Sequence, residues 1–336
     1  MFARAAVRTR PIAANARRWA STEAKASSSN WGLYAGAAGV VGLGAYLYLD
    51  RSGAKPATKT ELKSPLDPNG FVEFPLKRIE PYNHNTAKYV YALPEGTAAQ
   101  LPVASCVYLK STGDNAPKDA KGNPVARPYT PISAPDLPGE FVFLIKKYDT
   151  GAMTPWIANM KEGDKIAVKG PLPKWPYKIN EFDDVGMIAG GSGITPMYQI
   201  LKYAVEDPSN KTRFKLIFAN VSEKDILLKE EFDELKKKYP NTFDVVYTLD
   251  QPSKGWKGPT GYVNADLVKK TFAPSNLGEK VKIFVCGPPG QMNSICGPKA
   301  SIKDQGELKG VLKELGYTEN QARCLCCFAL WAELNF

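Results

Sequence analysis

The stretch GGSGITP at residues 190–196 decides the fold of the second half of this chain. It follows the apolar run VGMIA and precedes an amphipathic run, expected to form a helix whose first residue is Pro196. Glycines in a strand-to-helix turn let the backbone approach a diphosphate, and the helix start offers free N–H groups. The stretch therefore predicts a dinucleotide turn. Because proline replaces the last glycine of the usual fingerprint, an ordinary strand-to-helix turn is the alternative.

Strands alternate with helices on both sides of this turn. The apolar runs FKLIFAN, FDVVYTL and VKIFVC are separated by helical patterns, one of them directly after Asn264. Ser222 with Asp225 three residues later is a capping pattern for the helix that contains Phe232. Such alternation predicts an α/β doubly wound domain with a parallel sheet, placed at residues 178–320.

The preceding segment, residues 70–177, has the period of strands. Short apolar runs broken by proline and glycine recur without helical periodicity between them: FVEFPLKRI, KYVYAL, VASCVYL, EFVFLIKKY and DKIAVKG. One helix, TPWIANM, interrupts them just after Gly151. This pattern predicts an antiparallel β-barrel domain that comes before the nucleotide domain.

The stretch RPYTPIS at residues 127–133 gathers groups that suit a phosphorylated planar cofactor. Arg127 can hold phosphate oxygens bidentately, the ring of Tyr129 can stack on a flat ring, and Thr130 can bond to a polar ring edge. Taken alone, the segment is more typical of a proline-rich loop that carries an incidental arginine.

Composition narrows the chemistry. The chain has 336 residues, 43% hydrophobic and 23% charged, enough for about two globular domains. The single histidine, His84, excludes bis-His haem and the usual catalytic zinc sites, so no metal is expected. The six cysteines do not have the spacing of a disulfide framework, and reduced thiols are expected. The net charge of +10 favours an acidic partner, unless it is simply a solvated lysine surface.

The N-terminus has the composition of an address followed by an anchor. Residues 1–20 hold five arginines and no acidic residue, which is typical of a mitochondrial transit peptide. Residues 31–49 carry no charge and have aromatic residues at both ends, so they predict a single transmembrane helix. Residues 50–69 are expected to be the linker to the rest of the chain.

Together these stretches resemble a known family. RPYTPIS, KKYDTGAMTPWIANMKEGDKIAVKGP, IAGGSGITPMYQI, DILLKEEF, GPTGYV and FVCGPPG, in this order, are similar to NADH-cytochrome b5 reductases, most of all to fungal mitochondrial members. The likeness covers about residues 71–320. It implies the ferredoxin-NADP reductase fold, FAD as cofactor, NADH as substrate, and cytochrome b5 or a similar acidic haem protein as acceptor. It also implies a single-pass protein of the mitochondrial outer membrane, with a processed intermembrane-space form as a second expectation. A monomeric soluble domain and no nucleic-acid partner are expected.

The resemblance also assigns roles to matching residues. Arg127 would hold FAD phosphate, Tyr129 would pack on the flavin ring, and Thr130 would bond near its reactive nitrogen. Cys286 would close the pocket near the nicotinamide and is grouped with Thr130 as catalytic. The other cofactor contacts that the resemblance implies are Pro128, Ser133, Lys146, Tyr148, Gly151, Met153, Thr154, Gly190, Gly191, Gly193, Thr195, Pro196, Gly287 and Pro288. Ala152 stands where the family often has a lysine.

Two further residues have competing interpretations. Asp250 ends the run FDVVYTL, where a carboxylate would accept hydrogen bonds from a ribose and repel the extra phosphate of NADPH. Without the resemblance, Asp250 is equally a turn residue. Cys286 has the alternative of a small apolar core residue. Because hydride passes directly between nicotinamide and flavin in this family, we assign Cys286 to positioning.

The end of the chain departs from the family. Residues 321–336 read QARCLCCFALWAELNF, which is longer, more apolar and richer in cysteine than a family C-terminus. Metal binding by these cysteines is disfavoured because no fourth ligand lies nearby in the sequence. Two other functions stay open: a related flavin reductase with another acceptor, such as an ascorbate radical or an iron-sulfur oxygenase, and a catalytically dead membrane adaptor with the same fold.

Overall fold

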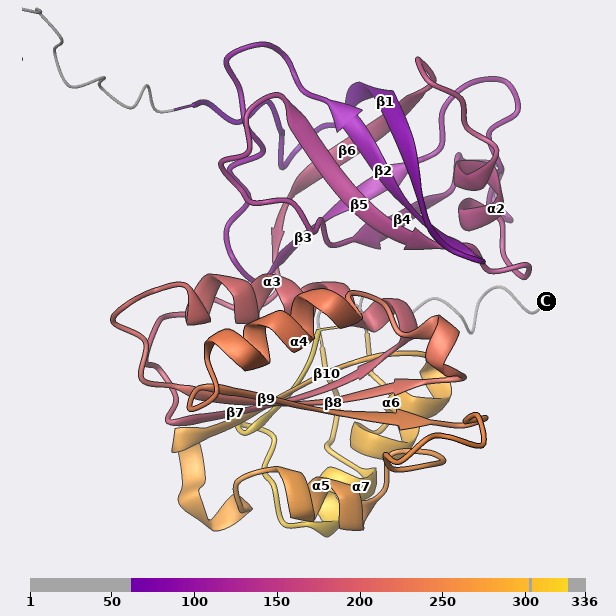
Figure 1. Cartoon of the computed structure of the whole chain (residues 1–336). Helices are drawn as coiled ribbons and strands as arrows, with labels where there is room; N and C mark the ends of the chain where they lie inside the picture. The colour runs from indigo at the N-terminus through magenta and orange to yellow at the C-terminus, as the bar shows by residue number, and fades with distance from the viewer. Residues whose placement is uncertain (1–61, 302–303, 326–336) are drawn as a thin grey trace, which may run out of the picture. The chain divides into compact units, whose positions relative to one another are not determined.

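The computed structural model describes residues 62–301 and 304–325 (Figure 1), and these belong to one compact unit that begins at residue 61. The predicted transit peptide and transmembrane helix lie outside the described residues, as does most of the linker and of the C-terminal tail. Within the described part of the chain, no helix has the length and apolar character needed to cross a membrane.

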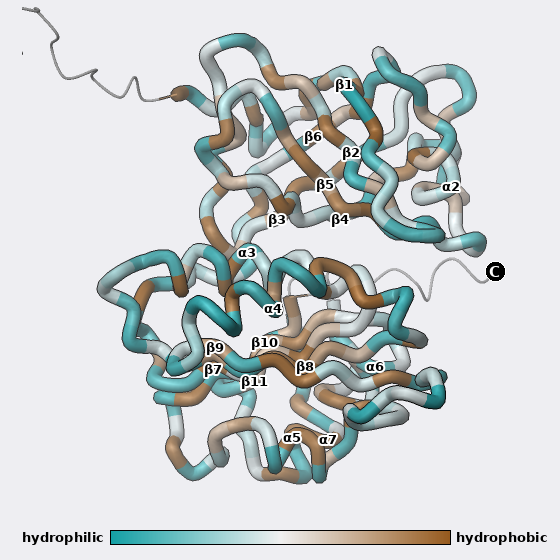
Figure 2. The backbone as a smooth tube through the Cα atoms, viewed as in Figure 1, coloured by the Kyte–Doolittle hydropathy of each residue, from teal (hydrophilic) through white to brown (hydrophobic). Residues whose placement is uncertain are grey.

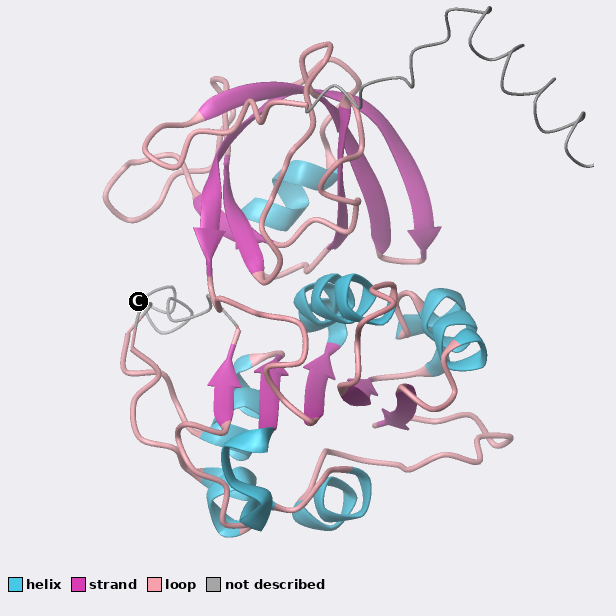
Figure 3. Ribbon diagram, turned by 90° about the vertical axis from the view of Figure 1, so that its left-hand side faces the viewer, coloured by secondary structure: helices cyan, strands magenta, loops and turns pink. Residues whose placement is uncertain are grey.

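The first part of the described chain is a six-stranded antiparallel sheet. Its hydrogen-bonded order is β4-β3-β6-β1-β2-β5, and every pairing is antiparallel. Figure 3 shows the strands curving rather than lying flat. The strands are β1 (Val72–Asn83), β2 (Thr86–Ala92), β3 (Ser105–Lys110), β4 (Ala126–Tyr129), β5 (Glu140–Lys146) and β6 (Lys165–Pro173).

Strand β4 was not foreseen as a strand, because its sequence contains Pro128. Proline has no N–H for the ladder and is confined to edge positions, and β4 does pair on one side only, with β3. The consequence is that Arg127 and Tyr129 are held on a strand and not on a loop.

The core of this sheet is aromatic. Phe141 and Phe143 on β5 are fully buried and stack edge to face, with ring centroids 4.6 Å apart. Tyr129 meets Phe143 in the same edge-on way at 6.5 Å. The short helix α2 (Met153–Ala158) is anchored in this core by Ile157, which has no exposed surface. The phosphate-suited stretch is therefore fastened to the core through its aromatic residue.

The second part is a five-stranded parallel sheet with the order β11-β10-β7-β8-β9. Helices α3 and α4 cover one face, and α5, α6 and α7 lie on the other (Figure 1). The strands are β7 (Asp184–Gly190), β8 (Arg213–Asn220), β9 (Phe243–Leu249), β10 (Val281–Cys286) and β11 (Ala322–Cys324). The helices are α3 (Ile194–Val205), α4 (Lys229–Lys238), α5 (Ala265–Thr271), α6 (Pro289–Cys296) and α7 (Gly310–Glu314), with 3-10 turns η1 (Gly191–Gly193), η2 (Glu223–Asp225) and η3 (Ser275–Lys280).

The central strands of this sheet are mainly hydrophobic, as the brown stretch at β8 in Figure 2 shows, although β8 carries Arg213 and Lys215 near its start and β10 carries Lys282. All residues of β7 and β10 are buried, which is expected of parallel strands covered on both faces. The chain order reverses at β7, since β8 continues on one side of it and β10 returns on the other. Ligands of such sheets bind beyond the carboxyl ends of the strands at this reversal, which is where GGSGITP and CGPPG begin.

Two local expectations were wrong in detail. Pro196 is the third residue of α3 and not its first, because the glycines form the 3-10 turn η1 and the helix begins at Ile194. Its missing N–H is still one of those a helix start leaves unpaired, so the helix tolerates it. The capping box of Ser222 and Asp225 caps the start of η2 and not that of α4. The residue that precedes α4 is Leu228, which has a left-handed conformation.

Candidate functional site

The motifs singled out in the sequence meet at one cavity of about 770 Å³. One side, here called the sheet wall, comes from residues 127–130 and 144–154. The other side, the nucleotide wall, comes from residues 190–196 and 286–291. The two walls belong to different sheets, so the cavity exists only because both folds are present in one unit.

Nearly all of the predicted site residues line this cavity. Ser133 is the exception: it is not among the lining residues, and its Oγ accepts a hydrogen bond from the N–H of Val142 at 3.2 Å. The predicted residues that do line the cavity are Arg127, Pro128, Tyr129, Thr130, Lys146, Tyr148, Gly151, Met153, Thr154, Gly190, Gly191, Gly193, Thr195, Pro196, Asp250, Cys286, Gly287 and Pro288.

The glycines of the nucleotide wall are required by the protein's own packing. A Cβ atom on Gly193 would lie 2.6 Å from the carbonyl carbon of Cys286 and 2.8 Å from the nitrogen of Gly287, both backbone atoms. A Cβ on Gly190 would lie 2.8 Å from Cδ of Pro288. Gly191 has φ +51°, a left-handed conformation that glycine adopts without strain. The two glycine turns therefore pack directly against each other.

On the sheet wall, side chains face the cavity instead. Arg127 is half-buried, and its guanidinium donates a hydrogen bond to the carbonyl of Ala126 at 2.8 Å. The Arg127 side chain lines the cavity, and this hydrogen bond fixes the orientation of its remaining N–H groups. Burial raises the pKa of Tyr129, so its hydroxyl is neutral at physiological pH.

Tyr148 joins the two walls. Its hydroxyl lies 2.9 Å from Oγ of Ser192 in the glycine turn. Its backbone N–H donates to Oγ1 of Thr154 at 3.0 Å, which ties Tyr148 to the first turn of α2. Ser192 lies inside the GGSGITP stretch but was not among the predicted site residues.

Lys146 links the sheet wall to η2 of the second domain, a contact that the sequence did not reveal. Its Nζ lies 2.8 Å from Oδ1 of Asp225, and the two side chains are only 12% and 10% exposed. Nε2 of His84 is 3.6 Å from the same oxygen. Burial acts to raise the pKa of Asp225, but hydrogen bonds from Lys146 and Ser222 outweigh it and hold the pKa below its usual value. The carboxylate of Asp225 is therefore favoured in its ionised form.

Two amide side chains in the cavity lining have buried atoms with no hydrogen-bond partner within the described residues. Both amide atoms of Asn220, at the end of β8, are buried and unpaired, and so is Nε2 of Gln291 on α6. Buried polar groups are normally satisfied, so these two point to a ligand that supplies their partners. The only sequence signal for Asn220 was its place at the end of a buried strand, and for Gln291 its place just after CGPPG.

Asp250 lies at the outer rim of the cavity, exposed to solvent. Its N–H donates to the carbonyl of Asn220 at 3.1 Å, which sets the carboxylate beside the end of β8. Partial desolvation raises the pKa of Asp250 above its ordinary value. The neighbouring Tyr262 is 81% exposed and also lines the cavity, a further residue that sequence reasoning missed.

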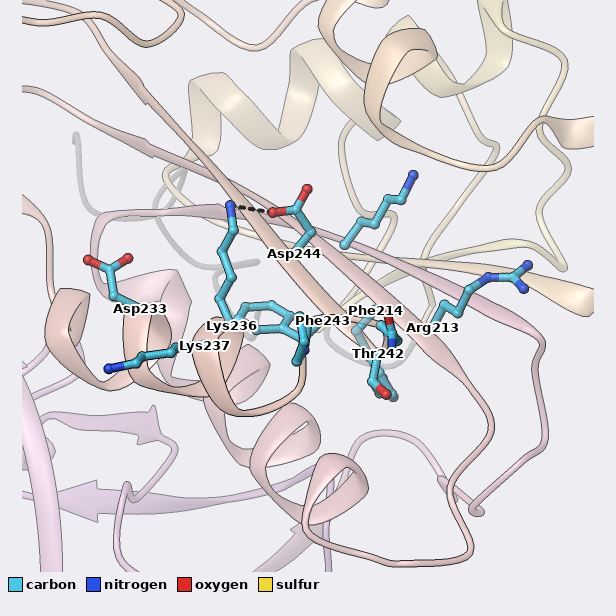
Figure 4. Close-up of a pocket in the computed structure, with 11 residues that line it drawn as sticks. Arg213, Phe214, Asp233, Lys236, Lys237, Thr242, Phe243 and Asp244 are labelled. Atoms are coloured by element: carbon cyan, nitrogen blue, oxygen red, sulfur yellow. Dashed lines mark ion pairs between the residues drawn. The ribbon is translucent and has the colours of Figure 1, made fainter.

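A second hollow, of about 850 Å³, lies at the opposite ends of the parallel strands (Figure 4). It is lined by cationic side chains that are largely paired: Lys236 with Asp244 at 2.6 Å, and Arg213 with Asp184 at 2.7 Å. None of the predicted site residues lines it. The chemistry therefore belongs to the cavity between the two walls.

The residues of that cavity fit FAD and NADH. An aromatic face and a guanidinium on the sheet wall suit a flat ring with a phosphate tail. Glycine backbone at the carboxyl end of a parallel sheet, with unpaired amides of Asn220 and Gln291, suits a dinucleotide. Comparison with known families agrees: residues 73–177 match the oxidoreductase FAD-binding domain, and residues 187–297 match the oxidoreductase NAD-binding domain. The molecule is an oxidoreductase of the class that carries both domains.

Relatives define the family more narrowly. The NADH-cytochrome b5 reductase 2 of Botryotinia fuckeliana is 41% identical over 348 residues, covering 96% of this chain and 99% of the relative. That of Mycosarcoma maydis is 51% identical over 256 residues, covering 76% and 73%. The cytochrome b5 reductase domain of Ulva prolifera nitrate reductase has a similar structure, with a TM-score of 0.68, 25% identity, and coverage of 78% of this chain and all of that domain. The chain belongs to the fungal NADH-cytochrome b5 reductase 2 family.

Proposed function

We propose that this protein takes electrons from NADH and passes them through FAD to cytochrome b5 or a similar acidic one-electron acceptor. The observation that carries the proposal is the single cavity in which RPYT of one sheet faces GGSGITP and CGPP of the other. Bound there, FAD supplies the chemistry of accepting a hydride and releasing electrons singly. The chain itself supplies binding and orientation.

The sheet wall holds the flavin in this proposal. Arg127 binds phosphate oxygens, Tyr129 packs on the ring, and Thr130 bonds near the reactive nitrogen. The attachment of Tyr129 to the aromatic core supports its role, because a ring that is held by Phe143 cannot swing out of the cavity. Lys146 acts on this site through its ion pair with Asp225, which joins strand β5 to the turn η2.

The nucleotide wall holds NADH. Gly190, Gly191 and Gly193 bring backbone close to the diphosphate, and Cys286 positions the nicotinamide against the flavin. The burial of Cys286, which is 5% exposed, holds it in a fixed place at the end of β10 and supports a positioning role. At the rim, Asp250 accepts hydrogen bonds from the adenosine ribose and disfavours NADPH.

The finer organisation of the chain is part of the same proposal. We place the flavin domain at residues 70–177, closing as a barrel, and the NADH domain at residues 178–320. Residues 1–20 direct the chain to mitochondria, and residues 31–49 anchor it once in the outer membrane, with residues 50–69 as linker. The supporting observations are the arginine-rich start and the uncharged, aromatic-ended stretch.

Electrostatic steering of the acceptor follows from the net charge of +10. Raising ionic strength is expected to slow reduction of cytochrome b5 several-fold, because the Debye length falls from about 10 Å at 0.1 M salt to about 3 Å at 1 M. Reduction of a small uncharged acceptor, such as a neutral quinone, serves as the comparison and should change much less. Equal salt dependence with both acceptors contradicts the steering.

The central test is optical. The full chain, purified in detergent, should be yellow, and stoichiometric NADH added without oxygen should bleach it faster than NADPH does. Subsequent addition of cytochrome b5 should restore the colour as the haem is reduced. A colourless protein that cannot be reconstituted with FAD would favour a catalytically dead adaptor. A yellow protein that NADH bleaches but cytochrome b5 does not restore would favour a reductase with another acceptor.

A further inference from the structure

Two cysteine side chains meet behind the nucleotide wall. Sγ of Cys296, the last residue of α6, lies 2.8 Å from Sγ of Cys324, the last residue of β11. The two residues are 28 positions apart in sequence and come from different elements of the second sheet. A disulfide has a sulfur–sulfur separation of about 2.0 Å, so small side-chain rotations bring these atoms to bonding distance.

Both sulfurs are enclosed by protein. Cys296 is 1% exposed and Cys324 is 5% exposed. The Cys296 thiol can also donate to the carbonyl of Met292 at 3.4 Å, and the N–H of Cys324 donates to Oε1 of Gln305 at 2.8 Å. These contacts hold the two sulfurs close together in the folded chain.

The surroundings lower the pKa of the Cys324 thiol. A hydrogen bond from Cys296 lowers the pKa of the Cys324 thiol, burial opposes this, and the positive charges of Lys299 and Arg323 add to the lowering. A thiolate is the form that reacts with oxidants, and a second thiol at contact distance is what converts the first product to a disulfide.

We propose that Cys296 and Cys324 are an oxidation site, held as two thiols and converted to an intramolecular disulfide by hydroperoxides. The site is separate from the electron-transfer reaction, and it stands whether or not the proposed acceptor is right.

The chemistry balances with hydrogen peroxide as the only oxidant. The Cys324 thiolate attacks one peroxide oxygen, the S–O bond forms as the O–O bond breaks, and the leaving hydroxide becomes water on protonation. The Cys296 sulfur then attacks the Cys324 sulfenic acid, the S–S bond forms as the S–O bond breaks, and a second water leaves with the Cys296 proton. Two thiols lose two electrons and two protons, and peroxide becomes two waters.

This disulfide would fix the rear of the nucleotide wall. Ile295 and Leu325, each next to one of the two cysteines, line the cavity, and Cys286 on the adjacent strand does so too. A covalent link between α6 and β11 therefore restrains two lining segments that are otherwise joined only by non-covalent contacts. Cross-links of this kind stabilise the folded chain chiefly by restricting the unfolded one.

The test is a mass measurement on the full chain. To keep the assignment unique, the background carries Cys326→Ser and Cys327→Ser, which leaves Cys106, Cys286, Cys296 and Cys324. After hydrogen peroxide and alkylation, a tryptic digest should contain peptide 283–299 joined to the peptide that begins at Cys324, lighter by two hydrogens, with Cys286 carrying the alkyl label. Titratable thiols in denaturant should fall by two, and dithiothreitol should restore them.

Separate variants decide whether the pairing is specific. Cys324→Ser and Cys296→Ala should each abolish the linked peptide, and the oxidised parent should melt several degrees higher than the reduced one while both variants show no such shift. The parent measurement alone stands if a variant fails to fold. A link from Cys296 to Cys286 or Cys106, or oxidation of the parent without a linked peptide, overturns the proposal.

Discussion

The two walls of the cavity are constrained by different things. The nucleotide wall is fixed by backbone: Gly193 has no room for a side chain because the carbonyl of Cys286 occupies the space. The sheet wall is fixed by side chains, since Arg127 and Tyr129 project from an edge strand that pairs on one side only. A side chain added at Gly193 should therefore damage the fold, whereas loss of the Arg127 side chain should damage ligand binding and leave the fold intact.

The largest effect is expected from Gly193→Ala. The added methyl group meets backbone atoms of Cys286 and Gly287, which cannot move aside without shifting β10. Overpacking of this kind should lower the free energy of unfolding by about 3 kcal/mol. Urea unfolding of the apoprotein measures it, with Gly290→Ala as the matched control, because a Cβ there meets nothing within 4 Å. Equal stability of the two variants would remove the packing argument.

Arg127→Ala tests the other wall. Loss of a charge-assisted phosphate contact should weaken FAD binding by about 2 kcal/mol, roughly 30-fold, while unfolding of the apoprotein stays within about 0.5 kcal/mol of the parent. Flavin absorbance after dialysis gives the first quantity and urea unfolding the second. Arg127→Lys keeps the charge and loses the planar fork, so its FAD affinity should fall between that of the parent and that of Arg127→Ala. If apoprotein stability drops as much as FAD affinity, the two walls do not differ as described.

Asp250→Ala should change the choice of nucleotide without changing the fold. Removing the rim carboxylate should raise the ratio of kcat/KM for NADPH to that for NADH by about tenfold, or roughly 1.4 kcal/mol. The neighbouring Asp266, in the first turn of α5 and absent from the cavity lining, offers a control as Asp266→Ala. An unchanged ratio in the Asp250 variant would exclude Asp250 from nucleotide recognition.

The ion pair between Lys146 and Asp225 predicts that the free energy of unfolding depends on pH in the acid range. The pKa of Asp225 is lowered in the folded chain, so its contribution is present above the unfolded value of about 3.9 and is lost as pH falls through the folded value. Between pH 6 and pH 3 the parent should therefore lose about 1 kcal/mol more stability than Asp225→Asn does. Urea unfolding at fixed ionic strength across this range measures the difference. Parallel pH profiles would show that the ion pair with Lys146 contributes nothing.

The smallest effect is expected from Tyr148→Phe. Loss of the hydroxyl contact with Ser192 should alter stability by about 0.5 kcal/mol and KM for NADH by about twofold to threefold. Ser192→Ala removes the same contact from the other wall. If the double variant is no worse than either single variant, the contact is real, and if the effects add, the two side chains act independently.

How much of this could be read from the sequence follows from the same division. GGSGITP and RPYTPIS each carry their characteristic residues within seven consecutive positions. The alternating second domain, the strand-rich first domain and most lining residues could therefore be predicted. The contact between Gly193 and Cys286, the pairing of Lys146 with Asp225, and the orphan amides of Asn220 and Gln291 could not. Each depends on segments that are far apart in the chain and meet only in the folded protein, and the pairing of Lys146 with Asp225 needs both sheets.

Strand order also sets when the cavity can form during synthesis. All six strands of the antiparallel sheet precede β7, so the part that carries Arg127 leaves the ribosome complete. The central strand β7 and its glycine turn emerge next, but Cys286 on β10, against which Gly193 packs, follows by more than a quarter of the chain. Domains generally fold as units from the N-terminus during translation. A nascent chain that has reached only β9 thus carries a complete FAD-binding part, whereas its nucleotide-binding part still lacks β10, the strand that pairs with β7.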